Sequence, residues 1–152
     1  MHGTMVHRLL RFLALAAALS GCGPAHVGTV APKDAAFTVG CATGCGKDGR
    51  APSLTINVNF GGTYARQFSI CNEQRPALIA RLMVVQDLGC SGLEVPSATI
   101  GGLAIGTTTS ELNGKVAATL DAGEGFVAFQ CEGWLPELLE KLERTTCSLS
   151  TR

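Results

Sequence analysis

The strongest local pattern in this 152-residue chain is an alternation of apolar and polar residues that runs into a pair of glycines. Residues 53–70, SLTINVNFGGTYARQFSI, have the period of a half-buried β-hairpin. A two-residue turn at Gly61-Gly62 would mix the two faces, whereas a three-residue turn that includes Thr63 places Ile56 opposite Phe68. Because a slip of one residue inverts the faces of a strand, we predict the three-residue turn. The other pairs in this register are Phe60–Tyr64 and Leu54–Ile70 on the apolar face, and Thr55–Ser69 and Asn57–Gln67 on the polar face.

Two later segments have the residue pattern of helices. The first, at about 75–88, has Pro76 in its first turn and Gly89 at its end. The Val84-Val85 pair leaves a strand open as an alternative there. The second, at about 134–146, has an apolar stripe opposite a charged face with pairs four residues apart. The residues that carry these patterns are Leu78, Ile79, Leu82, Met83 and Val85 in the first helix, Trp134, Leu135, Leu138, Leu139 and Leu142 in the second, and the pairs Glu137–Lys141 and Glu140–Arg144.

The segment between the two helices, residues 93–131, is rich in Thr, Val and Ile and is interrupted by glycine-containing turns. It predicts a meander of short strands, with one tight turn at Asn113-Gly114. Together with the hairpin, it predicts a small antiparallel sheet packed with two helices. We therefore expect a single α+β domain at residues 36–152.

The N-terminus has the order of features found in an export signal. Arg8 and Arg11 precede an apolar run, Phe12 to Leu19, that is too short to span a bilayer. Either Met1 or Met5 could be the start. The run ends in Leu19-Ser20-Gly21-Cys22, which resembles the lipobox of bacterial lipoproteins. This resemblance covers the first 22 residues and identifies no family for the rest of the chain.

The lipobox resemblance implies a membrane-anchored protein. Residues 1–21 would be removed as a signal peptide, Cys22 would carry a diacylglyceryl group and an acylated amine, and residues 22–35 would form a flexible tether. Two or three acyl chains hold a protein stably on a membrane. Because Gly23 rather than Asp follows the lipidated residue, the resemblance implies the outer membrane in a Gram-negative host, and otherwise the outer face of the cell membrane.

The cysteine count agrees with this location. The chain has seven cysteines, and lipidation of Cys22 leaves six, which in an oxidising envelope suggests three disulfides. A helix about 20 Å long separates Cys131 from Cys147, too far for a bond that needs α-carbons within about 7 Å. The first predicted helix likewise separates Cys71 from Cys90, which disfavours that pair. A disulfide between Cys41 and Cys45 would close a very small loop. Eight connectivities stay open. The six candidates are Cys41, Cys45, Cys71, Cys90, Cys131 and Cys147.

The stretch GCATGCGKDGR, residues 40–50, allows several interpretations. A phosphate-binding loop would need Gly at Cys41 and Ser or Thr at Asp48, so no nucleotide is expected. The two cysteines, three residues apart, do not have the spacing of a thioredoxin-type pair. A four-cysteine zinc site that includes Cys41 and Cys45 is a minor alternative. All three histidines precede residue 27, so we predict disulfides here, with no metal and no cofactor.

Nothing in the sequence indicates catalysis. The expected mature domain has no histidine to serve as the base of a Ser-His-Asp triad. The stretch Gly89-Cys90-Ser91-Gly92 lacks one residue of a nucleophile elbow, and no signature points to a Ser-Lys dyad. The acidic residues that could form a catalytic pair are scattered over expected strands and turns. They are Glu94, Glu111, Asp121 and Glu124.

The charge and composition favour a binding protein. The chain has 12 acidic and 12 basic residues, and loss of Arg8 and Arg11 leaves a net charge near −2 without a basic run, so nucleic acid is not an expected partner. We expect a non-enzymatic interaction module for an envelope protein: an inhibitor, an immunity protein or an assembly subunit. The alternative is a carrier of an apolar ligand or lipid, because 46% of the residues are hydrophobic and only 16% are charged. An exposed apolar patch would favour the first function, and an apolar cavity the second.

Overall fold

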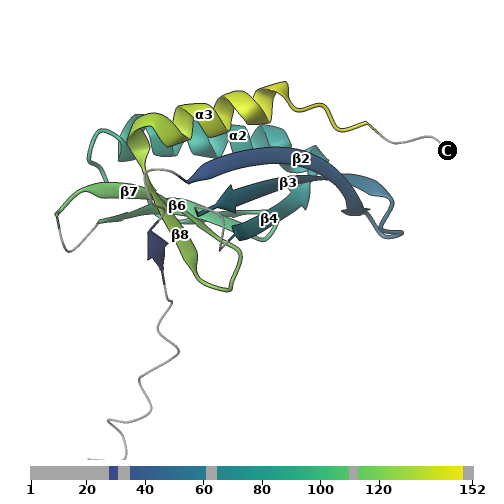
Figure 1. Cartoon of the computed structure of the whole chain (residues 1–152), viewed down its shortest axis with the longest axis horizontal. Coiled ribbons are helices and arrows are strands. Elements are labelled where there is room, and N and C mark those ends of the chain that lie inside the picture. The colour runs from purple at the N-terminus through teal and green to yellow at the C-terminus, as the bar shows by residue number, and fades with distance from the viewer. Residues whose placement is uncertain (1–27, 31–34, 61–64, 110–112, 149–152) are drawn as a thin grey trace, which may run out of the picture.

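The computed structural model describes residues 28–30, 35–60, 65–109 and 113–148. They form two β-sheets and a layer of two helices (Figure 1), which confirms the predicted α+β class. The three-stranded sheet has the order β2-β3-β4, and the five-stranded sheet has the order β1-β8-β7-β6-β5. The elements are β1 (Thr29–Val30), β2 (Ala36–Cys45), β3 (Ala51–Asn59), β4 (Ala65–Cys71), the short 3₁₀ turn η1 (Asn72–Gln74), α2 (Arg75–Val84), the π-helical turn η2 (Val85–Gly89), β5 (Ala98–Ile100), β6 (Leu103–Thr109), β7 (Val116–Asp121), β8 (Phe126–Gln130) and α3 (Cys131–Arg144).

The predicted hairpin forms β3 and β4. Ile56 pairs with Phe68 and Leu54 with Ile70, while Asn57 pairs with Gln67 on the other face, so the predicted register is confirmed. The predicted turn at residues 61–63 and Tyr64, the predicted partner of Phe60, lie outside the described residues. The alternation buries the apolar side of β3 completely or nearly so: Leu54, Ile56 and Val58 are at most 1% exposed.

The segment before the hairpin corrects one expectation. The predicted sheet did not include residues 36–45, but they form the ten-residue strand β2, antiparallel to β3. Phe37 is fully buried there. Its ring packs edge-to-face against Phe129 and Trp134, with ring centroids 5.5 and 5.1 Å apart. Small residues such as Gly40 hide the alternation in the sequence, and the paired edge of β3 supplies the hydrogen bonds that make the segment a strand.

The predicted meander is confirmed, but it forms a second sheet instead of joining the hairpin. Strands β5 to β8 are antiparallel neighbours in chain order. Gly101 and Gly102 form one of its turns with φ of 58° and 85°, a conformation that favours glycine. Within the expected tether at residues 22–35, Thr29–Val30 form β1 and pair in parallel with β8. Contacts with the domain therefore begin before residue 36.

Helix α2 has Pro76 in its first turn, as predicted. It continues into η2, which ends at Gly89. Gly89 does not have the left-handed φ of a glycine cap. A β-carbon at this position would lie 2.6 Å from the methyl carbon of Thr107. The glycine therefore allows η2 to pack closely on β6.

Helix α3 starts three residues earlier than predicted, because β8 leads into it directly at Cys131. The sequence pattern suggested a start near Trp134. Pro136 therefore lies inside the helix and not near its start. The helix ends at Arg144 and not at 146. The predicted leucine stripe is buried, and the predicted ion pairs form, at 2.5 Å for Glu137–Lys141 and 2.6 Å for Glu140–Arg144.

The segment that joins η2 to β5 passes very close to the backbone of β6. A β-carbon at Gly106 would lie 2.9 Å from the α-carbon of Ser97 and 3.0 Å from the carbonyl oxygen of Val95. Both atoms belong to the backbone, so neither can move without shifting the segment. Position 106 therefore requires a residue without a side chain.

We predict that Gly106→Ala lowers the free energy of unfolding by about 1–3 kcal/mol, because the added methyl group must displace the crossing segment. Urea denaturation of the oxidised protein measures this change. Gly40→Ala is the matched control, since its β-carbon would meet only the Thr55 hydroxyl, at 3.4 Å. Equal losses in the two variants would contradict the predicted close approach.

Candidate interaction surface

The six candidate cysteines form three disulfides. The pairs are Cys41–Cys147, Cys45–Cys71 and Cys90–Cys131, with α-carbons 5.5, 5.5 and 5.3 Å apart. This connectivity is one of the eight that the sequence leaves open, and none of the three disfavoured pairs occurs. One premise needs correction, because Cys131 is the first residue of α3 and does not lie beyond the helix.

The disulfides connect parts of the fold that are distant in sequence. Cys41–Cys147 ties β2 to the segment after α3 across 106 residues. Cys45–Cys71 joins the ends of β2 and β4, which lie on opposite sides of β3. The three-stranded sheet therefore curls at this end, as the strong bend of β2 shows (Figure 1). Cys90–Cys131 joins the segment after η2 to the start of α3.

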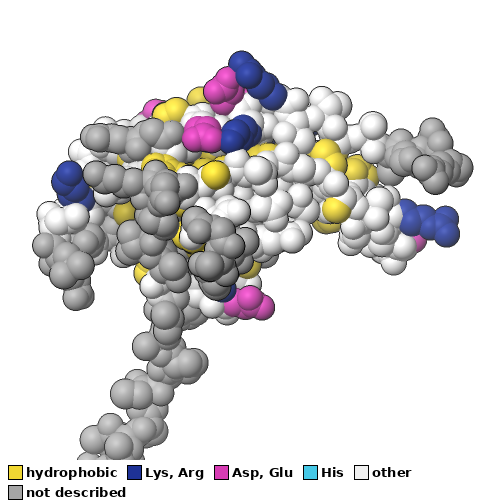
Figure 2. All heavy atoms as spheres, in the orientation of Figure 1, with side chains coloured by type: hydrophobic (Ala, Val, Ile, Leu, Met, Phe, Trp, Pro, Cys, Tyr) yellow, Lys and Arg dark blue, Asp and Glu magenta, His cyan; other side chains and the backbone are white. Residues whose placement is uncertain are grey.

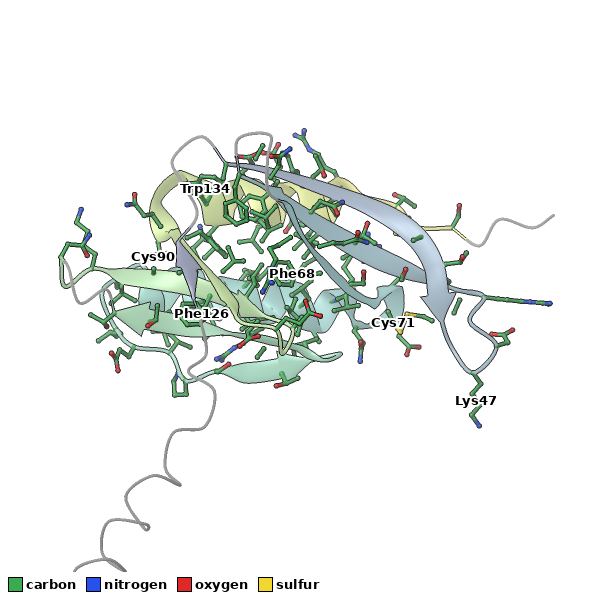
Figure 3. All side chains as sticks on the ribbon, turned by 60° about the horizontal axis from the view of Figure 1, so that its bottom comes forward. Lys47, Phe68, Cys71, Cys90, Phe126 and Trp134 are labelled. Atoms are coloured by element: carbon green, nitrogen blue, oxygen red, sulfur yellow. A yellow bond between two sulfur atoms is a disulfide. The ribbon has the colours of Figure 1, made fainter. Side chains whose placement is uncertain are left out.

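The stretch at residues 40–50 forms the end of β2 and the turn into β3. Lys47 lies at the tip of this turn and points into solvent, far from the core around Phe68 (Figure 3). A phosphate-binding loop leads into a helix, whereas this turn leads into a strand. Among the residues that the structure describes, no group of three or more His, Cys, Asp or Glu side chains could hold a metal ion.

The residues considered for catalysis make separate local contacts. Cys90 is in a disulfide, and the Ser91 hydroxyl donates a hydrogen bond to the Asp87 carbonyl at 2.6 Å. Glu94 accepts a hydrogen bond from Thr109 at 2.8 Å. Asp121 accepts one from the Gly123 amide, and Glu124 lies 4.0 Å from Arg66. Glu111 lies outside the described residues.

Helix α2, with the turn and loop that follow it, carries the most unusual surface of the described chain. One face is buried through Leu78, Leu82 and Val85. The opposite face is also apolar, and Asp87 is its one exposed charge between residues 76 and 88. Leu93 adjoins Leu88, to which it is linked by a backbone hydrogen bond of 3.1 Å. The exposed apolar residues, which we call the α2 patch, are Pro76, Ala77, Ala80, Met83, Val84, Leu88 and Leu93.

The cationic residues of α2 turn away from this patch. Arg81 donates hydrogen bonds to the carbonyl of Ile105, at 3.1 Å, and to that of Pro96. Arg75 donates to the carbonyls of Thr145 and Leu142 beyond the other side of the helix. Both guanidinium groups thus hold α2 against its neighbours, and the outward surface is left without a basic residue.

Helix α3 has the opposite character. Its outward face carries ion pairs and further exposed charged residues, as is normal for a helix that covers a core. Large side chains on the α2 patch are 40 to 57% exposed, and they are the four exposed large hydrophobic residues in the described chain: Met83, Val84, Leu88 and Leu93. In the part of the chain that the structure describes, no helix is long and apolar enough to cross a membrane.

The surface also has shallow depressions, which do not form an apolar cavity. One of about 350 Å³ lies on the outer face of the curled three-stranded sheet. Its lining includes Ser53, Thr55, Gln67 and Ser69, which are polar and uncharged. Another, of about 340 Å³, lies beside the Cys90–Cys131 disulfide. Between the sheets and helices, the space is filled by buried side chains that include Phe37, Phe68, Phe129, Leu135 and Leu138.

The disulfide pattern predicts which thiol each cysteine substitution releases. In Cys147→Ser, iodoacetamide should alkylate Cys41 and should leave Cys45 unmodified. Peptide mapping by mass spectrometry under non-reducing conditions locates the alkyl group. Cys71→Ser is the matched control, in which Cys45 should be alkylated instead. Each substitution should lower the free energy of unfolding by about 2–5 kcal/mol. Alkylation of Cys45 in Cys147→Ser would contradict the pattern.

Comparison with known proteins identifies no relative of this chain. No protein-family model matches it, and no curated protein or solved structure matches it either.

Proposed function

We propose that this protein is anchored to the cell envelope by lipid on Cys22 and acts there as a non-enzymatic protein-interaction module. The α2 patch is the surface that would bind the partner. Support for the anchor comes from the lipobox resemblance and from the odd number of cysteines. Cys22 itself lies outside the described residues.

The observation that carries the proposal is the apolar character of both faces of α2. A helix that only covers a core has a polar outward face, as α3 has. Contiguous apolar surface in contact with water is unfavourable, and on soluble domains it commonly marks a binding site. Covering Val84, Leu88 and Leu93 with a partner would remove this surface from water.

A protein partner fits the patch better than a membrane surface does. Helices that lie on membranes carry basic residues beside their apolar face. Here both arginines of α2 face inward, and Asp87 is the exposed charge. The chain also enters the domain at β1, on the side of the sheets away from the helix layer (Figure 1).

The partner's contact element that suits the patch is an amphipathic helix. Ala77, Ala80, Val84 and Leu88 follow one another at intervals of three or four residues, so they form a ridge along α2 and into η2. Such ridges pack into the grooves of a second helix, and alanines let the two backbones approach closely. The three disulfides hold the fold in place before binding, which lowers the ordering cost of association.

The alternative function, a carrier of an apolar ligand or lipid, receives less support. Its expected feature was a cavity lined by Leu, Ile and Phe between the sheet and the helices. Side chains of Phe37, Phe68 and Leu138 fill that space and are at most 2% exposed. The three classes of interaction module, an inhibitor, an immunity protein and an assembly subunit, are all compatible with the patch.

The anchor predicts a specific mass for the protein extracted from membranes. The chain should begin at Cys22, carry the mass of two or three acyl chains, and take up no alkyl groups before reduction. Intact mass spectrometry after non-reducing alkylation measures all three. Cys22→Ser should abolish acylation and release the protein from the membrane fraction. A wild-type chain that retains residues 1–21 and carries no acyl mass would contradict the anchor.

The patch predicts site-specific contact with one protein partner. A photo-crosslinking amino acid at Val84 in the intact chain should give one discrete protein adduct in cells, and adding Leu88→Asp should lower its yield about tenfold or more. The same crosslinker at Glu143, which is exposed on α3, is the matched control and should give no such adduct. Adducts to lipid alone at Val84 would refute the proposal and favour the carrier.

A further inference from the structure

We propose that the free edge of β2 pairs with β2 of a second copy of this chain, so that the two three-stranded sheets become one continuous six-stranded sheet. This inference rests on the geometry of β2 and does not depend on the α2 patch or on the lipid anchor. It assigns a second interaction surface to the protein, with a different occupant.

Strand β2 is the longest edge strand of the described sheets. The other edges are β1 and β5, with two and three residues, and β4, with seven. Arg66 of β4 donates to the carbonyls of Glu124 and Gly125 in the turn before β8, so a segment of the other sheet is already held against this strand. In the described ranges, no backbone hydrogen bond links the outer edge of β2 to another segment.

The backbone groups that point outward from β2 can be identified. Pro52 has no N–H, so the Thr43–Pro52 pair cannot exchange two hydrogen bonds with β3. Residues 38, 40 and 42 must therefore bond to β3, and the odd-numbered residues point away from it. Independently, the outward carbonyl of Phe37 accepts a hydrogen bond of 2.6 Å from Lys141. The outward residues are Phe37, Val39, Cys41 and Thr43.

The edge lacks the features that usually prevent strands from pairing. Natural proteins protect long edges with charged residues, proline or strong bulges. Residues 36–43, AFTVGCAT, contain no charge and no proline. The bulge in β2 lies at Gly44, beyond Thr43. Figure 2 shows a broad surface without charge over the part of β2 to the right of its centre, where the side chains are small or hydroxylic.

A second copy suits this edge because the edge is compatible with two-fold symmetry. An antiparallel pairing centred on Gly40 places Val39 opposite Cys41 of the second copy, and Phe37 opposite its Thr43. All four outward residues on each strand are then used. Like charges opposite each other would disfavour a symmetric pair, and this segment has none.

The charged residues beside the edge do not oppose this pairing. Lys141 of α3, which forms an ion pair of 2.5 Å with Glu137, also donates to the carbonyl of Phe37 in β2. A carbonyl oxygen can accept two hydrogen bonds, so Lys141 can keep its contact with Phe37 when a strand arrives. The disulfide at Cys41 points to Cys147, over the inner face of the sheet, and leaves the backbone edge open.

The test uses charge reversal at the symmetry axis in the full chain, purified in a mild detergent. The wild-type protein should form a reversible dimer in sedimentation experiments, with a dissociation constant on the order of 10–100 µM, because the interface is small. Gly40→Lys should raise this constant about tenfold or more, since two like charges would face each other, and Gly40→Glu should do the same. An equimolar mixture of the two variants should restore the dimer.

Two controls separate pairing from damage to the fold. Thr99→Lys adds the same charge to an exposed threonine on the short edge strand β5, and it should leave the dimer unchanged. Thermal melting and the absence of free thiols verify that each variant is folded. A wild-type protein that stays monomeric to about 1 mM would overturn the proposal. So would a mixture of the two charged variants that associates no better than either one alone.

Amide hydrogen exchange gives a readout of the pairing itself. In the wild-type chain, the amides of Val39, Cys41 and Thr43 should become protected as the protein concentration rises. Those of Gly40 and Ala42 should be protected at every concentration, because they bond to β3. Dimerisation without this alternating protection would show that another surface joins the two copies and would overturn the assignment to β2.

Discussion

The contacts of Phe37 hold the two sheets and the terminal helix in one structure. This side chain extends from β2 in the three-stranded sheet and packs against Phe129 of β8 in the five-stranded sheet and against Trp134 of α3. Its carbonyl also accepts a hydrogen bond from Lys141. Because this fully buried side chain contacts both β8 and α3, the position of β2 is coupled to the position of the other sheet and of the terminal helix.

The disulfides and the inward-facing arginines fix the rest of the fold around this junction. Cys41–Cys147 lies four residues along β2 from Phe37 and holds the segment after α3 against the strand. Arg75 and Arg81 hold α2 through carbonyls of its neighbours. Because its two arginines bind these carbonyls, α2 is held on the core while its outward face is apolar. The proposed partner-binding surface is thus a consequence of how the helix is held.

The two proposed surfaces differ in chemistry. The α2 patch offers apolar side chains and would bind through burial of that surface, which suits a helix of another protein. The edge of β2 offers backbone groups and small uncharged side chains, which suits a strand of the same protein. Figure 1 places them on different elements, with α2 behind α3 and β2 at the front, so one copy could use both surfaces at once.

The sequence by itself determined the elements whose pattern is local. The alternation at residues 53–70 specified the β3–β4 register, and the leucine stripe specified the buried face of α3, because strand and helix periods place side chains on defined faces. The odd cysteine count also indicated three disulfides. Tertiary structure alone decided that residues 36–45 form a strand, since Gly40 and Ala42 have little preference for one and the pairing partner lies in β3. It also decided the cysteine pairs, the split into two sheets and the outward apolar face of α2, because each depends on which distant residues, such as the carbonyls that bind Arg81, come together in space.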